Sequence, residues 1–169
     1  MREVLLIDTS VYLVLLEIPD VEHDIGDLRA RYDAMTDQTR LLLPMATVWE
    51  TGNHISRLAN GDLRYRHACT FVDDVTKAFR GEAPYGTTHF PDMDELITWL
   101  AEFPQRVQCN KSPTKTNEGP SLADVSIIKE WERTCQLHPG SNVEIWSLDD
   151  DLSGYSNPGW RPAGRRTNP

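Results

Sequence analysis

An apolar run from Val4 to Ile7 leads without a break into Asp8, Thr9 and Ser10. Such a run, followed at once by polar residues, is typical of a strand that is buried on both faces of a parallel sheet. A carboxylate and a hydroxyl group then stand at the carboxyl end of this strand. Ligands of open α/β sheets bind at that end. The segment therefore predicts a parallel sheet with a polar site at its edge.

Strand and helix patterns alternate along the rest of the chain. Buried strands are expected at residues 40–46 and 143–148, and residues 106–109 fit a short additional strand. Helices are predicted over residues 10–17, 24–39, 47–60, 62–80, 93–103 and 121–136, with Thr47 and Ser121 as N-caps and Gly61 as the C-terminal glycine of the third helix. Loops are expected at residues 81–91 and 110–120. The alternation predicts an α/β fold with a mainly parallel central sheet and helices on both faces.

The length of 169 residues fits one domain with a core of its own. The three cysteines show no CxxC spacing and indicate neither a disulfide framework nor a zinc site. The apolar runs are shorter than the roughly 20 residues of a membrane span. We therefore expect a soluble, cytoplasmic protein with one domain over residues 1–156 and a flexible tail over residues 157–169.

The net charge of −9 argues against a protein that holds nucleic acid by bulk electrostatic attraction. The basic residues are nevertheless gathered in a few stretches. These are Arg57, Arg64, Arg66, Lys77 and Arg80, then Arg106, Lys111 and Lys115, and finally Arg161, Arg165 and Arg166. Two interpretations are open: solvated faces of helices, or a local basic rim around an acidic site.

Four acidic positions follow a predicted strand or lie in the first turns of the helix beyond it: Asp8, Glu50, Asp124 and the run from Asp149 to Asp151. Each also has an ordinary structural explanation. Asp8 is a suitable helix N-cap, and Glu50 is a favourable charge near a helix N-terminus. Asp124, three residues after Ser121, resembles the acidic position of a capping box, with Asp in place of the usual Glu or Gln. The three adjacent aspartates fit a solvated acidic turn.

The places of these acids in the predicted fold favour a shared site, because the carboxyl ends of parallel strands meet at one edge of a sheet. Two carboxylates about 4 Å apart repel by roughly 4 kcal/mol at an effective dielectric constant near 20. A cluster of them therefore requires a cation. Oxygen ligands without Cys or His favour Mg²⁺ or Mn²⁺ over zinc, and such ions indicate phosphodiester chemistry.

Four short motifs follow one another in a defined order and spacing: residues 6–10 (Leu-Ile-Asp-Thr-Ser), 46–50 (Ala-Thr-Val-Trp-Glu), 121–127 (Ser-Leu-Ala-Asp-Val-Ser-Ile) and 146–152 (Trp-Ser-Leu-Asp-Asp-Asp-Leu). Together they resemble the PIN domain and, more narrowly, the VapC-type toxin ribonucleases of bacterial toxin–antitoxin pairs. The resemblance spans residues 3 to about 155. It implies a three-layer α/β/α fold, metal-dependent endoribonuclease activity on RNA as the toxin of a type II pair, a small cognate antitoxin and commonly a homodimer.

The resemblance also implies roles for single residues. Asp8, Glu50, Asp124 and Asp149 would chelate Mg²⁺ or Mn²⁺. Asp151 matches a further acidic position of the family, although Leu152 stands where the family often has an aromatic residue. Ser10 would hold a water molecule at the metal or a scissile phosphate oxygen. Residues 62–120 are longer than compact members need, which indicates a helical insertion or clip.

Other interpretations stay open. One is a catalytically inactive PIN-like module that binds RNA or protein. Another is a phosphatase of the haloacid dehalogenase kind, which requires a second Asp where this chain has Ser10. His54, one turn after Glu50, is a candidate general base or phosphate contact. Trp160, in the Arg-containing tail, is a candidate for stacking on a base or for anchoring a partner.

Overall fold

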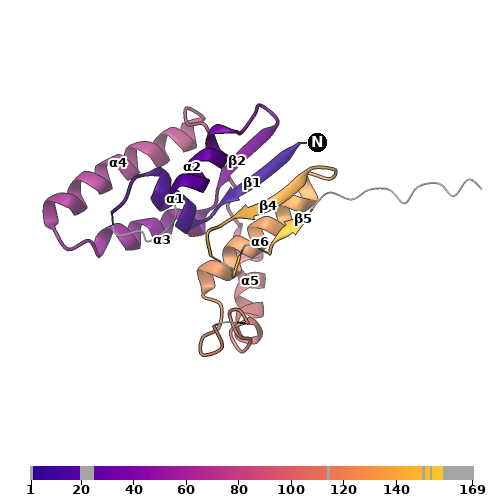
Figure 1. Ribbon diagram of the computed structural model, residues 1–169. Coiled ribbons are helices and arrows are strands. Elements are labelled where there is room, and N and C mark those ends of the chain that lie inside the picture. Colours follow the sequence, from indigo (N-terminus) through magenta and orange to yellow (C-terminus); the bar gives the residue numbers. More distant parts are fainter. Residues whose placement is uncertain (1, 20–24, 114, 150, 153, 158–169) are drawn as a thin grey trace, which may run out of the picture.

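The computed structural model has an α/β fold and describes residues 2–19, 25–113, 115–149, 151–152 and 154–157 (Figure 1). Strands and helices alternate along the chain, as the sequence predicts. The elements are β1 (Glu3–Ile7), α1 (Thr9–Leu15), α2 (Ile25–Asp33), β2 (Thr39–Leu43), α3 (Met45–Ser56), α4 (Gly61–Arg80), β3 (Gly86–Thr87), α5 (Met93–Arg106), α6 (Leu122–Leu137), β4 (Asn142–Trp146) and β5 (Ser156–Asn157).

Within the described residues, the sheet has five strands in the order β3-β2-β1-β4-β5, and every neighbouring pair is parallel except β4 and β5. The central strand β1 ends in register with β4, where Ile7 pairs with Trp146. The next residues, Asp8 and Ser147, therefore reach the same edge of the sheet although 139 positions separate them in the sequence. This register places the polar ends of two strands side by side.

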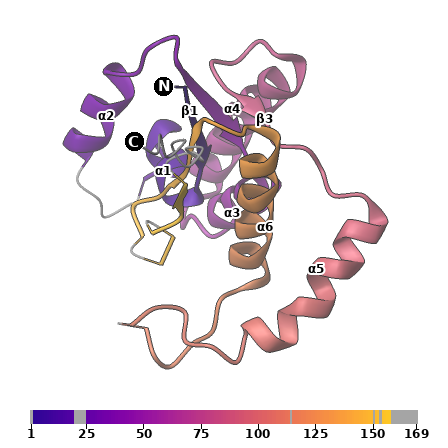
Figure 2. The ribbon, with the colours of Figure 1, turned by 90° about the vertical axis from the view of Figure 1, so that its right-hand side faces the viewer.

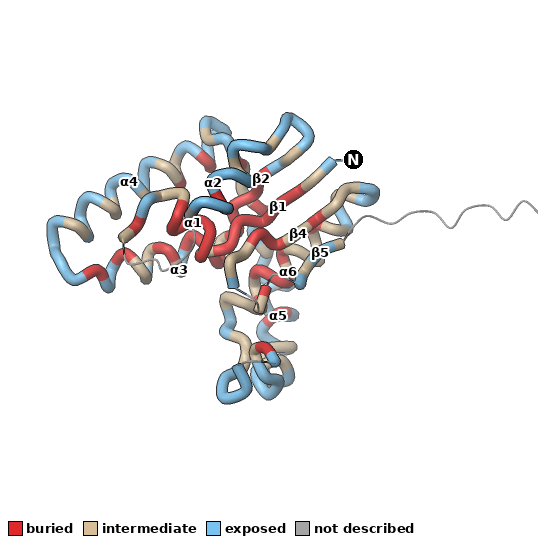
Figure 3. Tube along the Cα trace, viewed as in Figure 1, coloured by how far each residue is buried: buried red, intermediate tan, exposed pale blue. Residues whose placement is uncertain are grey.

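Helices cover both faces of the sheet and give the fold three layers (Figure 2). On one face, Leu5 and Leu43 belong to a core cluster with residues of α1, α2 and α4. On the other face, Leu6 and Leu42 pack against Trp131 of α6. Helix α5 packs on α6 and lies outside this layer (Figure 2). Because β1 is buried from both sides, its run of apolar residues has no polar alternation (Figure 3).

The long helix α4 packs on the core and is also joined to it by one carboxylate. Asp74 accepts hydrogen bonds from the hydroxyl groups of Tyr12, at 2.6 Å, and Tyr85. Burial, reinforced by the hydrogen bond to Asp74, raises the pKa of both tyrosines above their ordinary value. Tyr12 lies on α1 and Tyr85 directly precedes β3. Asp74 thus joins α4 to helix α1 and to the segment that leads into β3.

Helix α3 begins at Met45 after Pro44, which provides no side-chain cap. A buried acid from another helix compensates: Glu130 of α6 bonds to the backbone N–H groups of Met45 and Ala46. A negative charge at this end also complements the helix dipole. Glu130 is 2% exposed, and burial raises its pKa despite these bonds. Glu130 of α6 therefore fixes the start of α3, the helix that carries Glu50.

Thr47 is not an N-cap, which corrects the sequence-based expectation. The helix starts two residues earlier, and the Thr47 hydroxyl instead donates to the carbonyl oxygen of Ile7 at 2.7 Å. Gly61 does not end this helix either. Arg57 is the C-cap of α3, and Gly61 opens α4 because the Asn60 side chain accepts from two N–H groups of its first turn.

Three other boundaries differ from the prediction. Residues 106–109 form no strand, because Arg106 ends α5 and is held there by ion pairs with Glu102 and Glu132. The helix expected over residues 24–39 ends at Asp33, since Thr39 already begins β2. The expected loop over residues 81–91 contains the short strand β3.

Residues 62–120, the proposed insertion, contain most of α4 as well as β3 and α5. The first two belong to the helical layer and the sheet, whereas α5 lies outside α6. Asn157, expected as the first residue of the tail, pairs with Val143 in β5. The rest of the tail, including Trp160, lies outside the described residues. Within the described ranges, no helix has the length and apolar character needed to cross a membrane.

Candidate functional site

The carboxyl ends of β1 and β4 open on a pocket of about 410 Å³. Its wall contains all the residues that the sequence assigns to the site: Asp8, Ser10, Glu50, Asp124, Asp149 and Asp151. They come from the end of β1, from α1, α3 and α6, and from the segment after β4. Four segments that are distant in the sequence thus meet at one edge of the sheet, as a parallel arrangement predicts.

Asp8 is 5% exposed and serves both as the N-cap of α1 and as part of the pocket. Its Oδ2 atom accepts hydrogen bonds from Ser10 Oγ at 2.7 Å and from Ser147 Oγ at 2.8 Å. Ser10 Oγ in turn accepts from the backbone N–H of Leu148 at 3.0 Å. Ser10 therefore holds the ends of β1 and β4 together, in addition to any contact it makes within the pocket.

Glu50 lies in the second turn of α3 and accepts a hydrogen bond of 2.8 Å from Thr9 Oγ1. Burial, together with the nearby charges of Asp124 and Asp8, raises the pKa of Glu50 above its ordinary value, although the bond from Thr9 opposes the shift. Carboxylates thus repel one another here. A bound cation would relieve this repulsion.

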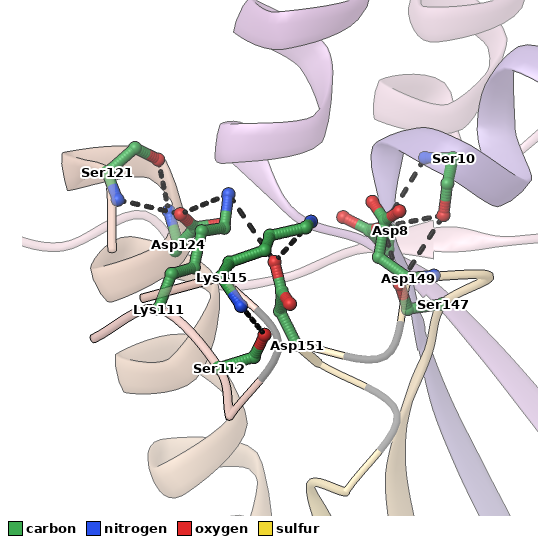
Figure 4. Close-up of polar contacts among 10 residues, drawn as sticks. All are labelled: Asp8, Ser10, Lys111, Ser112, Lys115, Ser121, Asp124, Ser147, Asp149 and Asp151. Carbon is green, nitrogen blue, oxygen red and sulfur yellow. Dashed lines mark hydrogen bonds and ion pairs between the residues drawn. The ribbon is translucent and has the colours of Figure 1, made fainter. Parts of the chain in front are cut away.

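Asp124 forms the predicted capping box with Ser121 at the start of α6 and also faces the pocket (Figure 4). Its Oδ2 atom lies 3.1 Å from Lys111 Nζ. Asp151 Oδ2 lies 2.7 Å from Lys115 Nζ and 3.7 Å from Lys111 Nζ. Asp124 therefore caps α6 and also lines the pocket, and two lysines reach the acidic side chains from the segment between α5 and α6.

These carboxylates raise the pKa of both lysines and so favour their charged form. Burial lowers the pKa of Lys111, but the hydrogen bond and the charge of Asp124 outweigh it, so the pKa lies above its ordinary value. The hydrogen bond to Asp151 raises the pKa of Lys115 in the same way. Burial acts to raise the pKa of Asp151, yet Lys115 and Lys111 bring it below its ordinary value. These three groups are therefore charged at neutral pH.

The chemistry of the pocket fits a hard divalent cation, because the acidic donors are all oxygen atoms. Asp151 Oδ1 is also buried and, among the described residues, has no hydrogen-bond partner. The carboxylates line one pocket but do not meet at a single point. The described part of the chain contains no group of three or more Asp, Glu, His or Cys side chains close enough together to hold a metal ion. Asp124 and Asp151 are turned toward lysines instead.

The sequence did not single out every residue of the pocket. Lys111 appeared only as one of a run of basic residues, and its contacts match the interpretation as a basic group at an acidic site. Asn53 and Arg57 also line the pocket, together with His54, the candidate from the sequence. These residues follow Glu50 at helical spacing and so lie on the same face of the helix. The helical period of the sequence could therefore have identified them.

No family model matches the chain. It is 28% identical over 98 residues to the symmetrical bis(5'-nucleosyl)-tetraphosphatase of Methylobacillus flagellatus. This match covers 58% of the chain but only 31% of that relative.

Among solved structures, the crystal structure of FitAcB from Neisseria gonorrhoeae contains a chain of similar fold, with a TM-score of 0.54 and 16% identity. The alignment covers 88% of this chain and 89% of that one. A structure of FitAB bound to an IR36 DNA fragment aligns over 77% and 79% of the two chains, with 18% identity and a TM-score of 0.48. The similarity to FitAcB supports the α/β fold with a mostly parallel five-stranded sheet.

Proposed function

We propose that this protein is a metal-dependent endoribonuclease that hydrolyses phosphodiester bonds of RNA. The observation that carries the proposal is the meeting of Asp8, Glu50, Asp124 and Asp149 in one pocket at the carboxyl edge of the sheet. These are the positions at which the resemblance to PIN domains implies metal ligands. The similar fold of a chain in the FitAcB structure supports the PIN-like architecture.

The same four carboxylates would hold Mg²⁺ or Mn²⁺. When bound, such an ion supplies the positive charge that activates water for in-line attack and stabilises the leaving oxygen. Thr9 orients Glu50, and Ser10 and Ser147 fix Asp8 through its Oδ2 atom. These hydroxyl groups hold the acids in place before substrate arrives, which lowers the cost of organising the site.

Basic residues at the pocket can contact the substrate despite the acidic net charge. His54 and Arg57 lie one and two turns beyond Glu50, on the same side of α3, and both line the pocket. An arginine offers paired donors to phosphate oxygens. We therefore assign the binding of the RNA backbone to this end of α3. Local attraction of this kind does not require a basic surface elsewhere.

A cleavage assay on single-stranded RNA tests this function. In the presence of Mn²⁺ or Mg²⁺, wild type should cut, and D8N should lose activity by about 100-fold or more. D33N is the matched control, because Asp33 is an exposed acid at the end of α2 outside the pocket. Equal cleavage by wild type and D8N would defeat the assignment. Absence of cleavage in both would favour the inactive binding module.

We further propose that the chain is the cytoplasmic toxin of a type II pair and binds a cognate antitoxin. An apolar groove of about 390 Å³ between α3, α5 and α6 offers a surface for a partner. Trp49, at its wall, is 68% exposed. A large exposed apolar surface of this kind typically marks a protein interface.

Growth of cells that produce the chain alone tests the toxin assignment. Induction of wild type should arrest growth, whereas induction of D8N should not. Unimpaired growth with wild type, combined with cleavage of RNA in vitro, would instead indicate a processing nuclease. Homodimer formation, the other expectation from the resemblance, is tested separately by light scattering of the purified chain, with W49D as the variant expected to dissociate a dimer built on this groove.

A further inference from the structure

Four of the five acidic side chains that line the pocket in the described residues fall into two groups with different partners, and Figure 4 draws the contacts of Asp8, Asp124 and Asp151. Asp8 and Glu50 form hydrogen bonds with hydroxyl groups, and within the described ranges no ion pair reaches either of them. Asp124 and Asp151 are paired with Lys111, and Asp151 also with Lys115. We call the first group the hydroxyl side of the pocket and the second the lysine side.

Lys111 lies between the two acids of the lysine side. Its Nζ atom is 3.1 Å from Asp124 Oδ2 and 3.7 Å from Asp151 Oδ2. The three side chains are largely shielded from solvent, with exposed fractions of 23% for Lys111, 12% for Asp124 and 4% for Asp151. One positive charge thus bridges two negative charges that are largely shielded from solvent, which is the arrangement that a bridging cation would otherwise provide.

The backbone around Lys111 places this ammonium group. The Lys111 N–H donates to the carbonyl oxygen of Glu118 at 2.8 Å and closes the loop between α5 and α6. Gly119 lies so close to Val107 that a Cβ atom there would come within 2.2 Å of the Val107 carbonyl oxygen. Any other residue at this position would force the loop to move. The position of Lys111 is therefore built into the fold.

We propose that Lys111 is a resident cation of the pocket and takes the place of a second metal ion, so that the site binds one divalent ion. This inference rests on the proposed metal-dependent function and adds the number of ions and a positioning residue to it. This narrows the ligand set proposed above: Lys111 holds Asp124 and Asp151, and the divalent ion is bound on the hydroxyl side, where no ion pair reaches Asp8 or Glu50 in the described structure. A second divalent ion would have to displace the ammonium group from Asp124 and Asp151.

Counting bound Mn²⁺ by equilibrium dialysis of the full-length chain tests this proposal without reference to activity. Wild type should bind one ion. K111Q removes the charge and keeps a polar side chain that is one bond shorter, and it should bind a second ion or bind Mn²⁺ about tenfold more tightly. K111R retains the charge and should bind one ion with the affinity of wild type. Thermal melting in EDTA shows that each variant is folded.

K129Q is the matched control for the loss of a lysine. Lys129 is paired with Glu102 and Glu132, at 2.7 Å and 3.1 Å, but does not line the pocket. Its Mn²⁺ stoichiometry and affinity should equal those of wild type. Two ions bound by wild type, or identical binding by wild type and K111Q, would overturn the role of Lys111. If wild type binds no Mn²⁺ at all, the metal-dependent function itself fails.

Discussion

The Thr47 hydroxyl on α3 donates a hydrogen bond of 2.7 Å to the carbonyl oxygen of Ile7, the last residue of β1. Both partners are completely buried. Ile7 directly precedes Asp8, and Thr47 lies one turn before Glu50. One hydrogen bond therefore links the two backbone segments that carry acids of the hydroxyl side.

Replacement of Thr47 by Val should destabilise the protein. The isosteric change removes the donor and leaves a buried carbonyl oxygen with one bond fewer, which costs about 1–2 kcal/mol. Thr51, one turn further along α3, provides a matched control: it is equally buried, but its hydroxyl has no hydrogen-bond partner in the described structure. T51V should therefore leave the unfolding free energy unchanged or raise it. Denaturation in urea measures both, and equal effects would contradict the importance of the bond to Ile7.

Two adjacent aspartates on α4 should respond very differently to substitution. Asp74 accepts hydrogen bonds from two tyrosines, whereas Asp73 forms an exposed ion pair with Lys77 at 2.6 Å. D74A leaves Tyr12 and Tyr85 without their acceptor, which should cost about 2–3 kcal/mol. D73A should cost less than about 0.5 kcal/mol. Thermal or urea unfolding distinguishes them, and equal losses would show that Asp74 does not anchor the helix.

Glu130 should make stability depend on pH. Because the folded-state pKa of Glu130 is raised by burial, its contribution to stability is present in full below its unfolded-state pKa and is lost as the pH rises through the folded-state pKa. E130Q does not titrate at this position. The difference in unfolding free energy, wild type minus E130Q, should therefore be largest near pH 4.5 and decrease toward pH 8.

The glutamine substitution also has an effect that does not depend on pH. Its amide nitrogen cannot accept from Thr88 or from the N–H groups that begin α3, so E130Q should be less stable than wild type at acidic pH. Urea denaturation at a series of pH values measures the difference. A difference that stays constant between pH 4.5 and pH 8 would contradict the raised pKa.

Divalent ions should stabilise the folded protein if the pocket binds them. An ion at ten times its dissociation constant adds about 1.4 kcal/mol of stability, provided that it does not bind the unfolded chain. Melting in Mg²⁺ or Mn²⁺ should then occur at a higher temperature than in EDTA, by about 3–6 °C for a chain of this length. D149N should show a smaller shift. An unchanged melting temperature for wild type up to 10 mM metal would argue against a site for divalent ions.

Local features of the sequence predict much of the fold. The apolar run of β1, the capping box of Ser121 and Asp124 and the strand before Asp149 are encoded in short stretches, and the structure contains all three. The start of α3 could not be read in the same way. Its N-terminal N–H groups bond to Glu130, which lies on another helix. No sequence pattern near Pro44 indicates that Glu130 is the partner.

The sequence alone determined which acids reach the carboxyl edge of the sheet, because strand ends and capping positions are set by near neighbours along the chain. Only the tertiary structure decided what those acids face there. The pairing of Lys111 with Asp124 depends on how the loop closes at Gly119 and on how α6 is oriented. Electrostatic interactions depend on distances through space, and these follow from the packing of segments that lie far apart in the chain.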